Sequence, residues 1–392
     1  MKIAILTSGI LPVPAVQGGA VENLIDFYLE YNNQHRLHDI TVYSIWHPDV
    51  KKHPALQSEV NHYKYINISG AIATIKIKVY KVLHSNEYYN YQTEYYFEQS
   101  YKDLKIQCFD CIILENRPGY AYKLSKRGIK KLVLHLHNDH LHLGSKFDKL
   151  LFDSFKKIIT VSDYIKHRVQ TIKTDNKIQT VHNGIDNKRF SPQQFTKLVK
   201  RKNMGLSNED FVIVFSGRIN KDKGISELID AMQKLKEYRR IKLLILGTTF
   251  YGNITHKNTF IQSLREKAEG LSEHIRFTGY IPYPNVPQYL QLADIAVLPS
   301  IWNEPFGLTI AEAQAVGIPI ITTSRGGIPE IVTEENAILL NTDKNFVSKL
   351  ASAIHYLYQH PEKRKQMSAA SLEHSKLFDK ETYAKNFFAA LD

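Results

Sequence analysis

The stretch DIAVLPSIWNEPFGLTIAEAQAVGIPIITTS, residues 294–324, contains an apolar strand candidate, a turn, a helical segment and a second apolar strand candidate. DIAVLPS and IPIITTS are short and largely apolar, as expected of strands buried on both faces of a sheet. LTIAEAQAVG lies between them and has the composition of a helix. This order predicts a βαβ unit, and therefore parallel strands.

The same alternation extends over nearly the whole chain and predicts an α/β fold. It begins with KIAILTSG and restarts at FVIVFSG near residue 211, after the polar, lysine-rich stretch 187–210. We expect two Rossmann-like domains whose parallel sheets face a central cleft at their carboxyl ends. The predicted domains cover residues 1–190 and 191–372, with a helix at 373–392 that packs back on the first domain.

The composition excludes several classes of protein. The chain has 392 residues, is 43% hydrophobic and contains 2 cysteines, so it is neither disordered nor a disulfide scaffold. We expect Cys108 and Cys111 to be packing residues. No apolar run reaches the roughly 18 residues of a membrane span, and the opening MKIAILTSGILPVP is too short and broken for a secretory signal. These features predict a cytoplasmic protein.

The positive charge is concentrated in the first half, where 26 Lys+Arg against 18 Asp+Glu in residues 1–190 give +8 of the total +12. Residues 62–101 break the alternation and are rich in Tyr and Lys. They form either a helical hairpin with Lys76, Lys78 and Lys81 facing solvent, or an element that contacts a membrane surface or an acceptor. A second candidate for docking on anionic lipid, or a merely solvated helix face, consists of Lys123, Lys126, Arg127, Lys130 and Lys131.

Two loops have the residues to bind phosphate. Gly18 and Gly19 follow the first strand and precede a helix, so the backbone there is able to approach a phosphate closely. Arg218 and Lys223 both come from one strand-to-helix loop, and two such cations suit a diphosphate. Either feature alone is weak, because many such turns contain glycines or solvated basic residues.

Glu304 and Glu312 stand eight residues apart, on either side of a helix start. Glu304 lies in the loop before Pro305, whereas Glu312 lies about a turn inside the helix. The helix N-terminus between them offers backbone amides and one hydroxyl to a phosphate, from Phe306, Gly307, Leu308 and Thr309. A nucleotide sugar needs this combination, because its diphosphate requires donors and its hydroxyls require carboxylate acceptors.

The spacing of these glutamates resembles the E-x7-E signature of retaining glycosyltransferase family 4, which has the GT-B fold. PAVQGGAVENL, HLHN, VHNGID, GRINKDKG and SRGGIPEIV match in the expected order. The resemblance extends from residue 1 to the last helix and is strongest to bacterial enzymes of surface polysaccharide or spore-coat glycan synthesis. It implies a cytoplasmic enzyme, peripheral on the inner face of the plasma membrane, that transfers a hexose with retention from a nucleotide donor to a glycan or lipid-linked acceptor, with UDP as the expected nucleotide.

The resemblance also implies roles for individual residues. Glu312 would hold the ribose, Glu304 the transferred sugar, and His137 would face that sugar near the reacting carbon. The diphosphate would be held by Arg218, Lys223 and the start of the helix after Glu304, with Gly18 and Gly19 closing over it from the acceptor-binding N-terminal domain. Neither a metal nor any other cofactor is expected, because the cations and the helix dipole replace it.

Three alternatives remain open. His135, His137, Asp139 and His140 spell H-x-H-x-D-H, which resembles the zinc signature of metallo-β-lactamase-fold hydrolases. A UDP-sugar epimerase on the same scaffold would share the nucleotide site, although no acid/base pair with matching spacing is recognisable. A non-enzymatic basic protein that binds nucleic acid or membrane is disfavoured by the ordered phosphate motifs, and we expect no nucleic-acid partner.

Overall fold

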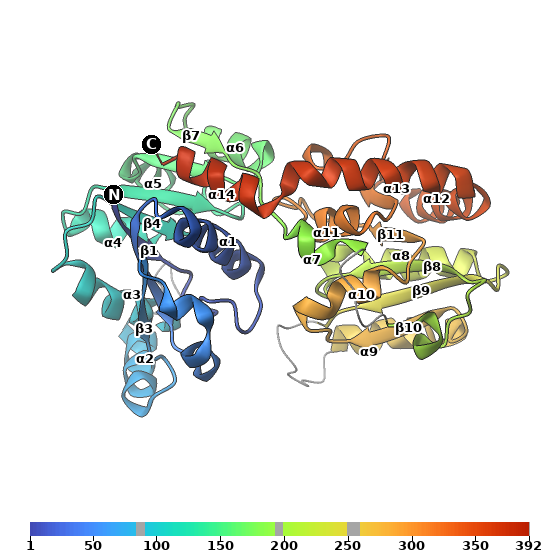
Figure 1. The fold of residues 1–392 in the computed structure, drawn as a ribbon, viewed down its shortest axis with the longest axis horizontal. Helices are drawn as coiled ribbons and strands as arrows, with labels where there is room; N and C mark the ends of the chain where they lie inside the picture. The colour runs from blue at the N-terminus through green and yellow to red at the C-terminus, as the bar shows by residue number, and fades with distance from the viewer. Residues whose placement is uncertain (84–90, 193–198, 249–258, 392) are drawn as a thin grey trace. The chain divides into compact units, whose positions relative to one another are not determined.

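The computed structural model describes residues 1–83, 91–192, 199–248 and 259–391, which divide into two compact units (Figure 1). The N-terminal unit contains Met1–Gly184 and Lys380–Asp392, and the C-terminal unit contains Ile185–Asp379. These divisions differ from the predicted ones at 190/191 and 372/373. Helix α7 (Asn187–Phe190) explains the first difference, because Phe190 is buried and its ring lies 5.9 Å from that of Tyr283 in the C-terminal unit.

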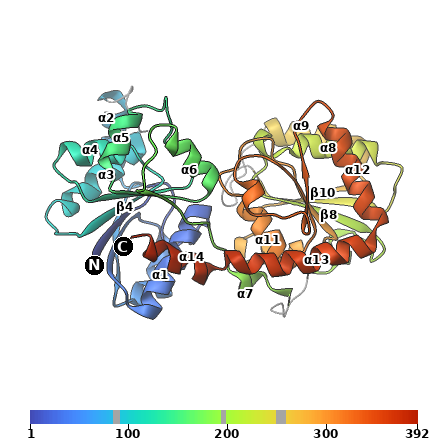
Figure 2. The ribbon, with the colours of Figure 1, turned by 90° about the horizontal axis from the view of Figure 1, so that it is seen from above.

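The N-terminal unit is built on a seven-stranded, all-parallel sheet. In spatial order its strands are β3 (Asn61–Ile66), β2 (Asp39–Ile45), β1 (Lys2–Leu6), β4 (Cys111–Glu115), β5 (Leu132–Leu136), β6 (Lys157–Thr160) and β7 (Ile178–Thr180). Helices α1 (Ala20–His35) and α14 (Lys380–Ala389) cover one face, and α3 (Tyr91–Leu104) and α4 (Tyr120–Lys126) the other (Figure 2). The strand order reverses between β1 and β4, which is where open α/β sheets bind ligands.

The C-terminal unit has a six-stranded parallel sheet with the same kind of reversal, between β8 and β11. In spatial order the strands are β10 (Ile275–Gly279), β9 (Ile241–Leu246), β8 (Phe211–Ser216), β11 (Ile295–Leu298), β12 (Ile320–Thr323) and β13 (Ala337–Leu340). The helices of this unit outside the α7 segment are α8 (Ile225–Lys234), α9 (Thr259–Lys267), α10 (Val286–Leu290), α11 (Leu308–Val316), α12 (Phe346–Gln359) and α13 (Pro361–Ser375).

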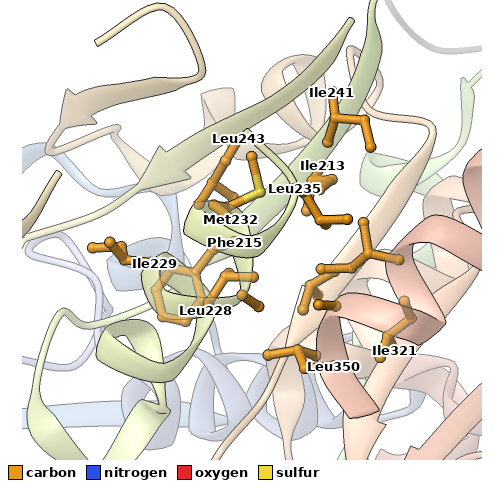
Figure 3. Close-up of a cluster of buried hydrophobic side chains, with 14 of the residues drawn as sticks. Ile213, Phe215, Leu228, Ile229, Met232, Leu235, Ile241, Leu243, Ile321 and Leu350 are labelled. Atoms are coloured by element: carbon orange, nitrogen blue, oxygen red, sulfur yellow. The ribbon is translucent and has the colours of Figure 1, made fainter. Parts of the chain in front are cut away.

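The main core of the C-terminal unit shows why these segments fold as they do. Alternate residues of β8, Ile213 and Phe215, point to the same side of the sheet and meet Leu228 and Met232 of α8 and Leu350 of α12 (Figure 3). The intervening strand residues are also fully buried, since the other face is covered too. Burial on both faces explains the continuous apolar runs, and the predicted α/β architecture with two parallel sheets is confirmed.

The segment 62–101, which breaks the alternation of strands and helices in the sequence, begins inside β3. It continues with α2 (Ala71–Leu83) and α3, and these two helices pack against each other. The turn of the predicted hairpin lies outside the described residues. Helices α5 (Asp148–Ser154) and α6 (Asp163–Gln170) complete the N-terminal unit as described. Within the described ranges, no helix has both the length and the apolar character needed to cross a bilayer. Cys108 is exposed and Cys111 is half-buried, which raises the pKa of the Cys111 thiol to about 11.

Helix α14 completes the core of the N-terminal unit although it follows the whole C-terminal unit in sequence. The Phe387 ring stacks on Tyr28 of α1 with centroids 4.3 Å apart, and Lys380 pairs with Glu30 at 2.8 Å. The chain at Gly184 passes close to α14. Only glycine fits there, because a Cβ at position 184 would lie 2.6 Å from the Cβ of Tyr383. The predicted helix at 373–392 therefore begins later, at Lys380, while residues up to Ser375 extend α13 in the other unit.

Truncating the aromatic anchor of α14 should destabilise the N-terminal unit. Phe387 is fully buried, so Phe387→Ala is expected to lower the free energy of unfolding by about 3–5 kcal/mol through lost burial and a residual cavity. Urea denaturation followed by circular dichroism measures the change. The matched control is Asn386→Ala on the exposed side of the same helix, which should change stability by less than about 0.5 kcal/mol. Equal stability of the two variants would contradict the described packing.

Candidate active site

A pocket opens at the carboxyl ends of β8 and β11 in the C-terminal unit, at the reversal point of the sheet. Four of the residues predicted from the sequence line it, namely Lys223, Glu304, Gly307 and Thr309. Its other lining residues are Phe215, Ser216, Leu298, Ser300, Ile310 and Ile328. The pocket therefore combines one cation, one carboxylate and a helix start with an apolar floor, which is the usual composition of a small-molecule site.

An ion pair joins the two loops of this pocket. The Lys223 ammonium lies 2.5 Å from Oε1 of Glu304, and the Ser300 hydroxyl donates to the same oxygen at 2.7 Å. Glu304 is only 7% exposed, and a buried carboxylate needs a partner of opposite charge. Lys223 is that partner. The Ser300 hydroxyl also lies 3.1 Å from the carbonyl oxygen of Asp222, which accepts a hydrogen bond from the Ile301 amide at 2.9 Å. The loops after β8 and β11 are thus fixed to each other.

Two glycines allow the close backbone contacts that place Glu304 and Lys223. Gly326 has a φ of 61°, and a Cβ there would lie 2.2 Å from the carbonyl oxygen of Glu304, which accepts a hydrogen bond from the Gly327 amide at 2.7 Å. Gly224 has a φ of 68°, and its Cβ would lie 1.9 Å from the carbonyl oxygen of Pro299. Any larger residue would push these loops apart.

The start of α11 faces the pocket through Gly307 and Thr309. Gly307 adopts a left-handed φ of 104° as the N-cap, and Leu308 is the first helical residue. Phe306 is buried, and its ring lies 5.7 Å from that of Phe378. The orphan amides of a helix start, together with its dipole, favour an anion at this position.

Glu312 lies one turn inside α11 and has a different environment. Its carboxyl group forms a hydrogen bond with Tyr283, and burial raises its pKa to about 7. Glu312 is not a lining residue of the pocket as described. Arg218 is exposed just after Gly217 and does not line that pocket either. Five side chains of this unit were expected to bind the donor. The pocket brings together three of them, Lys223, Glu304 and Thr309, and leaves out Arg218 and Glu312.

The raised pKa of Glu312 predicts a pH-dependent contribution to stability. Because the folded-state pKa is about 7 against an ordinary 4.5, the contribution is fully present below pH 4.5 and is lost as pH rises through 7. Relative to Glu312→Gln, the wild type should lose about 3 kcal/mol of unfolding free energy between pH 4.5 and 8, measured by urea denaturation. Exposed Glu273→Gln serves as the control, and parallel pH profiles for wild type and Glu312→Gln would refute the expectation.

A second cluster lies at the carboxyl ends of β4 and β5 in the N-terminal unit. One oxygen of Glu115 lies 2.9 Å from Nε2 of His137 and 3.1 Å from Nδ1 of His135. The other oxygen accepts a hydrogen bond from the Tyr28 hydroxyl at 2.9 Å. Glu115 and His135 have no exposed surface, and His137 is 6% exposed. The carboxylate is therefore satisfied by three side chains in the absence of solvent.

The electrostatics of this cluster keep Glu115 ionised. Burial by itself would raise the pKa of Glu115, but the electrostatic effect of His135 and the hydrogen bonds of both imidazoles outweigh it and hold the pKa at about 2. Burial, assisted by His135, lowers the pKa of His137 to about 4. A neutral His137 that donates Nε2–H to Glu115 presents Nδ1 as an acceptor, and this buried atom has no hydrogen-bond partner in the described part of the protein.

The histidine motif does not assemble the zinc signature of the alternative hydrolase interpretation. Asp139 instead accepts a hydrogen bond from Arg168 at 2.9 Å, and His140 is exposed. Both sheets are parallel, whereas the metallo-β-lactamase interpretation needs a sandwich of mixed sheets. Glu115, His135 and His137 nevertheless have the donor set of a metal site, with one ligand atom from each within 4.8 Å of the others. The expectation of a metal-free protein stays a prediction.

The glycine loop after β1 lies over another buried carboxyl group. Gly18 and Gly19 have φ values of 76° and 109°, and a Cβ on Gly19 would lie 2.2 Å from an oxygen of Glu22. Burial raises the pKa of Glu22 to about 7, and the Ser8 hydroxyl donates to it at 3.4 Å. No atom lies within 4 Å of where a Gly18 Cβ would be, so backbone at Gly18 is accessible.

The proposed basic patch on α4 is largely neutralised by α3. Lys123 forms an ion pair with the buried carboxylate of Glu94, and Arg127 pairs with Glu98 at 2.7 Å. Lys126 lies over the Tyr122 ring at 4.2 Å, whereas Lys130 and Lys131 are exposed beyond the helix. Two of the five charges are therefore compensated across helices, and docking of this patch on anionic lipid stays a prediction beside the alternative of a solvated helix face.

Sequence reasoning missed Glu115, although its strand FDCIILEN was identified. The available signal was positional. A glutamate at the carboxyl end of one central strand should meet polar residues at the end of its neighbour, and β4 pairs with β5 so that Glu115 stands opposite His135. Recognising this required the strand order, which the sequence pattern does not contain.

Comparison with known proteins agrees with this geometry. Residues 197–374, which lie within the C-terminal unit, match the family described as glycosyl transferases group 1. The chain is 27% identical to spore coat protein SA and 28% identical to the putative glycosyltransferase YtcC, both of Bacillus subtilis (strain 168), over 95% of its length and 93% and 87% of theirs. It shares the fold of Anabaena Alr3699/HepE, solved in complex with UDP-glucose, with a TM-score of 0.73, 20% identity and coverage of 100% and 99% of the two chains.

Proposed function

We propose that this protein is a retaining, metal-independent glycosyltransferase of family 4 that moves a hexose from a UDP-linked donor to a glycan or lipid-linked acceptor. The single observation that carries the proposal is the pocket in which Lys223 and Glu304 meet the start of α11, inside the glycosyl transferases group 1 domain. The UDP-glucose complex of the Anabaena relative supports the choice of donor. The similarity of this chain to spore coat protein SA and to the putative glycosyltransferase YtcC supports the proposal that the product is a surface glycan.

In this proposal the diphosphate binds at the start of α11. The amides at Phe306, Gly307 and Leu308, with the Thr309 hydroxyl, donate to phosphate oxygens. Lys223 and Arg218 neutralise the remaining negative charge of the diphosphate. The ammonium group of Lys223 acts as a compact charge, and the guanidinium group of Arg218 donates two parallel hydrogen bonds. The local ion pair with Glu304 keeps Lys223 in position before the donor arrives.

Two carboxylates then bind hydroxyl groups of the donor. Glu304, fixed by Ser300 and Lys223, accepts from the transferred sugar. Glu312 accepts hydrogen bonds from the ribose hydroxyls. For this, its hydrogen bond with Tyr283 has to break, or the carboxylate has to accept from both partners at once. In the N-terminal unit, the free Nδ1 of His137 accepts from a sugar hydroxyl, and the Gly18–Gly19 backbone contacts the phosphate.

The reaction is a front-face substitution. The bond between the anomeric carbon and the diphosphate oxygen breaks, and the acceptor oxygen bonds to the same face of that carbon. The acceptor proton passes to the departing phosphate oxygen, so the configuration is retained and no side chain serves as a general base. Lys223, Arg218 and the α11 dipole stabilise the negative charge of the leaving UDP, the usual electrostatic contribution to such a step. We place the enzyme in the cytoplasm, at the inner face of the plasma membrane.

The decisive experiment is a calorimetric and hydrolysis screen of UDP-, GDP- and ADP-sugars, followed by the same assays on variants. Lys223→Met should weaken donor binding at least about tenfold, and Glu304→Gln should lower turnover on the order of a hundredfold. Lys221→Met, an exposed lysine of the same loop, is the control. Wild-type behaviour of both variants would reject the site, and conversion of the donor sugar without acceptor would instead identify an epimerase.

Glu115 should act as a positioning residue for His137. Glu115→Gln removes the ionised acceptor that fixes the imidazole tautomer, so kcat should fall about tenfold with little change in donor KM, and the pH–rate profile should shift. Tyr28→Phe, which removes another hydrogen bond to the same carboxylate, is the matched control and should have a smaller effect. A proportional loss of activity in both variants with an unchanged pH profile would indicate a purely structural role.

A further inference from the structure

The surface of α2 carries four exposed apolar side chains. Ile72, Ile75, Val79 and Val82 are 70%, 64%, 50% and 79% exposed, respectively. Other large exposed apolar residues, such as Ile106 and Leu377, stand singly. Isolated apolar residues on a surface are normal, but four on one short helix call for an explanation.

Helical geometry places these four side chains in one stripe. At about 100° per residue, positions 72, 75, 79 and 82 fall within an arc of about 80°. Ala73 is 3% exposed and lies on the opposite side of the helix, toward the rest of the N-terminal unit. Figure 1 shows α2 beside α3 at one end of this unit. The stripe therefore faces away from the core that anchors the helix.

The charge on α2 has one sign. Its sequence AIATIKIKVYKVL contains three lysines and no acidic residue. Lys76 and Lys78 are exposed, and the helical period puts one on either flank of the apolar stripe. On α4, in contrast, Lys123 and Arg127 are paired with glutamates. Among the described contacts, Lys76 and Lys78 form no ion pair, so both are available to an external anionic surface, whereas the side chain of Lys81 lies outside the described part of the protein.

We infer that α2 docks the N-terminal unit on an anionic lipid bilayer, with Ile72, Ile75, Val79 and Val82 inserted between headgroups and Lys76 and Lys78 at the phosphate level. A helix of 13 residues is about 20 Å long and too short to span a bilayer, so it lies in the plane of the interface. Apolar insertion and attraction to acidic headgroups reinforce each other in this arrangement. The inference deepens the proposed membrane location, but its test needs no sugar nucleotide.

Co-sedimentation of the full chain with vesicles tests the inference. Wild-type protein should bind vesicles of phosphatidylglycerol mixed with phosphatidylcholine, and bind pure phosphatidylcholine much more weakly. Ile75→Ser/Val79→Ser and, separately, Lys76→Glu/Lys78→Glu should each weaken binding about tenfold or more. The matched controls are Ile106→Ser, an isoleucine even more exposed than Ile75, and Lys130→Glu/Lys131→Glu, which tests the residual basic patch.

Three outcomes would overturn the inference. The first is wild-type protein that does not bind anionic vesicles, and the second is α2 variants that bind as well as wild type. The third is a dimer in analytical ultracentrifugation that the α2 variants abolish, since that would assign the stripe to a second copy of the chain. UDP-sugar affinity, measured in parallel, should be unchanged in every variant, so failure of vesicle binding and failure of the transferase proposal are distinguished.

Discussion

Parallel pairing of the strands is the constraint on which the rest of the structure depends. A parallel strand is reached only through a crossover, so all carboxyl ends of a sheet lie at one edge. The helices that make the crossovers cover both faces, and the strands in between have to be apolar. The loops at the carboxyl edge are free to present polar and charged groups, and both clusters described above lie there, around Glu304 in one unit and Glu115 in the other.

Four carboxyl groups are buried near these edges, and each is accommodated differently. Glu304 is compensated by the ammonium group of Lys223, and Glu115 by two imidazoles and a phenol. Glu22 and Glu312 lack a nearby ion pair among the described contacts, and burial shifts both pKa values to about 7. The same residue type thus has a lowered pKa at Glu115 and a pKa raised to about 7 at Glu22 and Glu312, as local solvation and partners dictate.

The sequence predicted those features that depend on local pattern. Period and strand length identified the parallel sheets, and spacing within single loops identified Lys223, Glu304 and the start of α11. Contacts between distant segments escaped prediction. Glu115 meets His137 across 22 positions, and Lys123 meets Glu94 across 29, because the order of strands and the pairing of helices decide those contacts. The motif implied a ribose-binding role for Glu312, which stays a prediction, and it could not show the hydrogen bond with Tyr283, a residue from a separate segment.

Helix α14 has a consequence for the order in which the molecule assembles during translation. The ribosome delivers α1, β4 and β5 early, yet Phe387 and Tyr383, which seal the aromatic surface of Tyr28 and His135, emerge only after all of the C-terminal unit. The nascent N-terminal unit therefore has to wait with an uncovered apolar face while the second unit is made and folds. A chaperone that recognises exposed aromatic surface would meet its target during that interval.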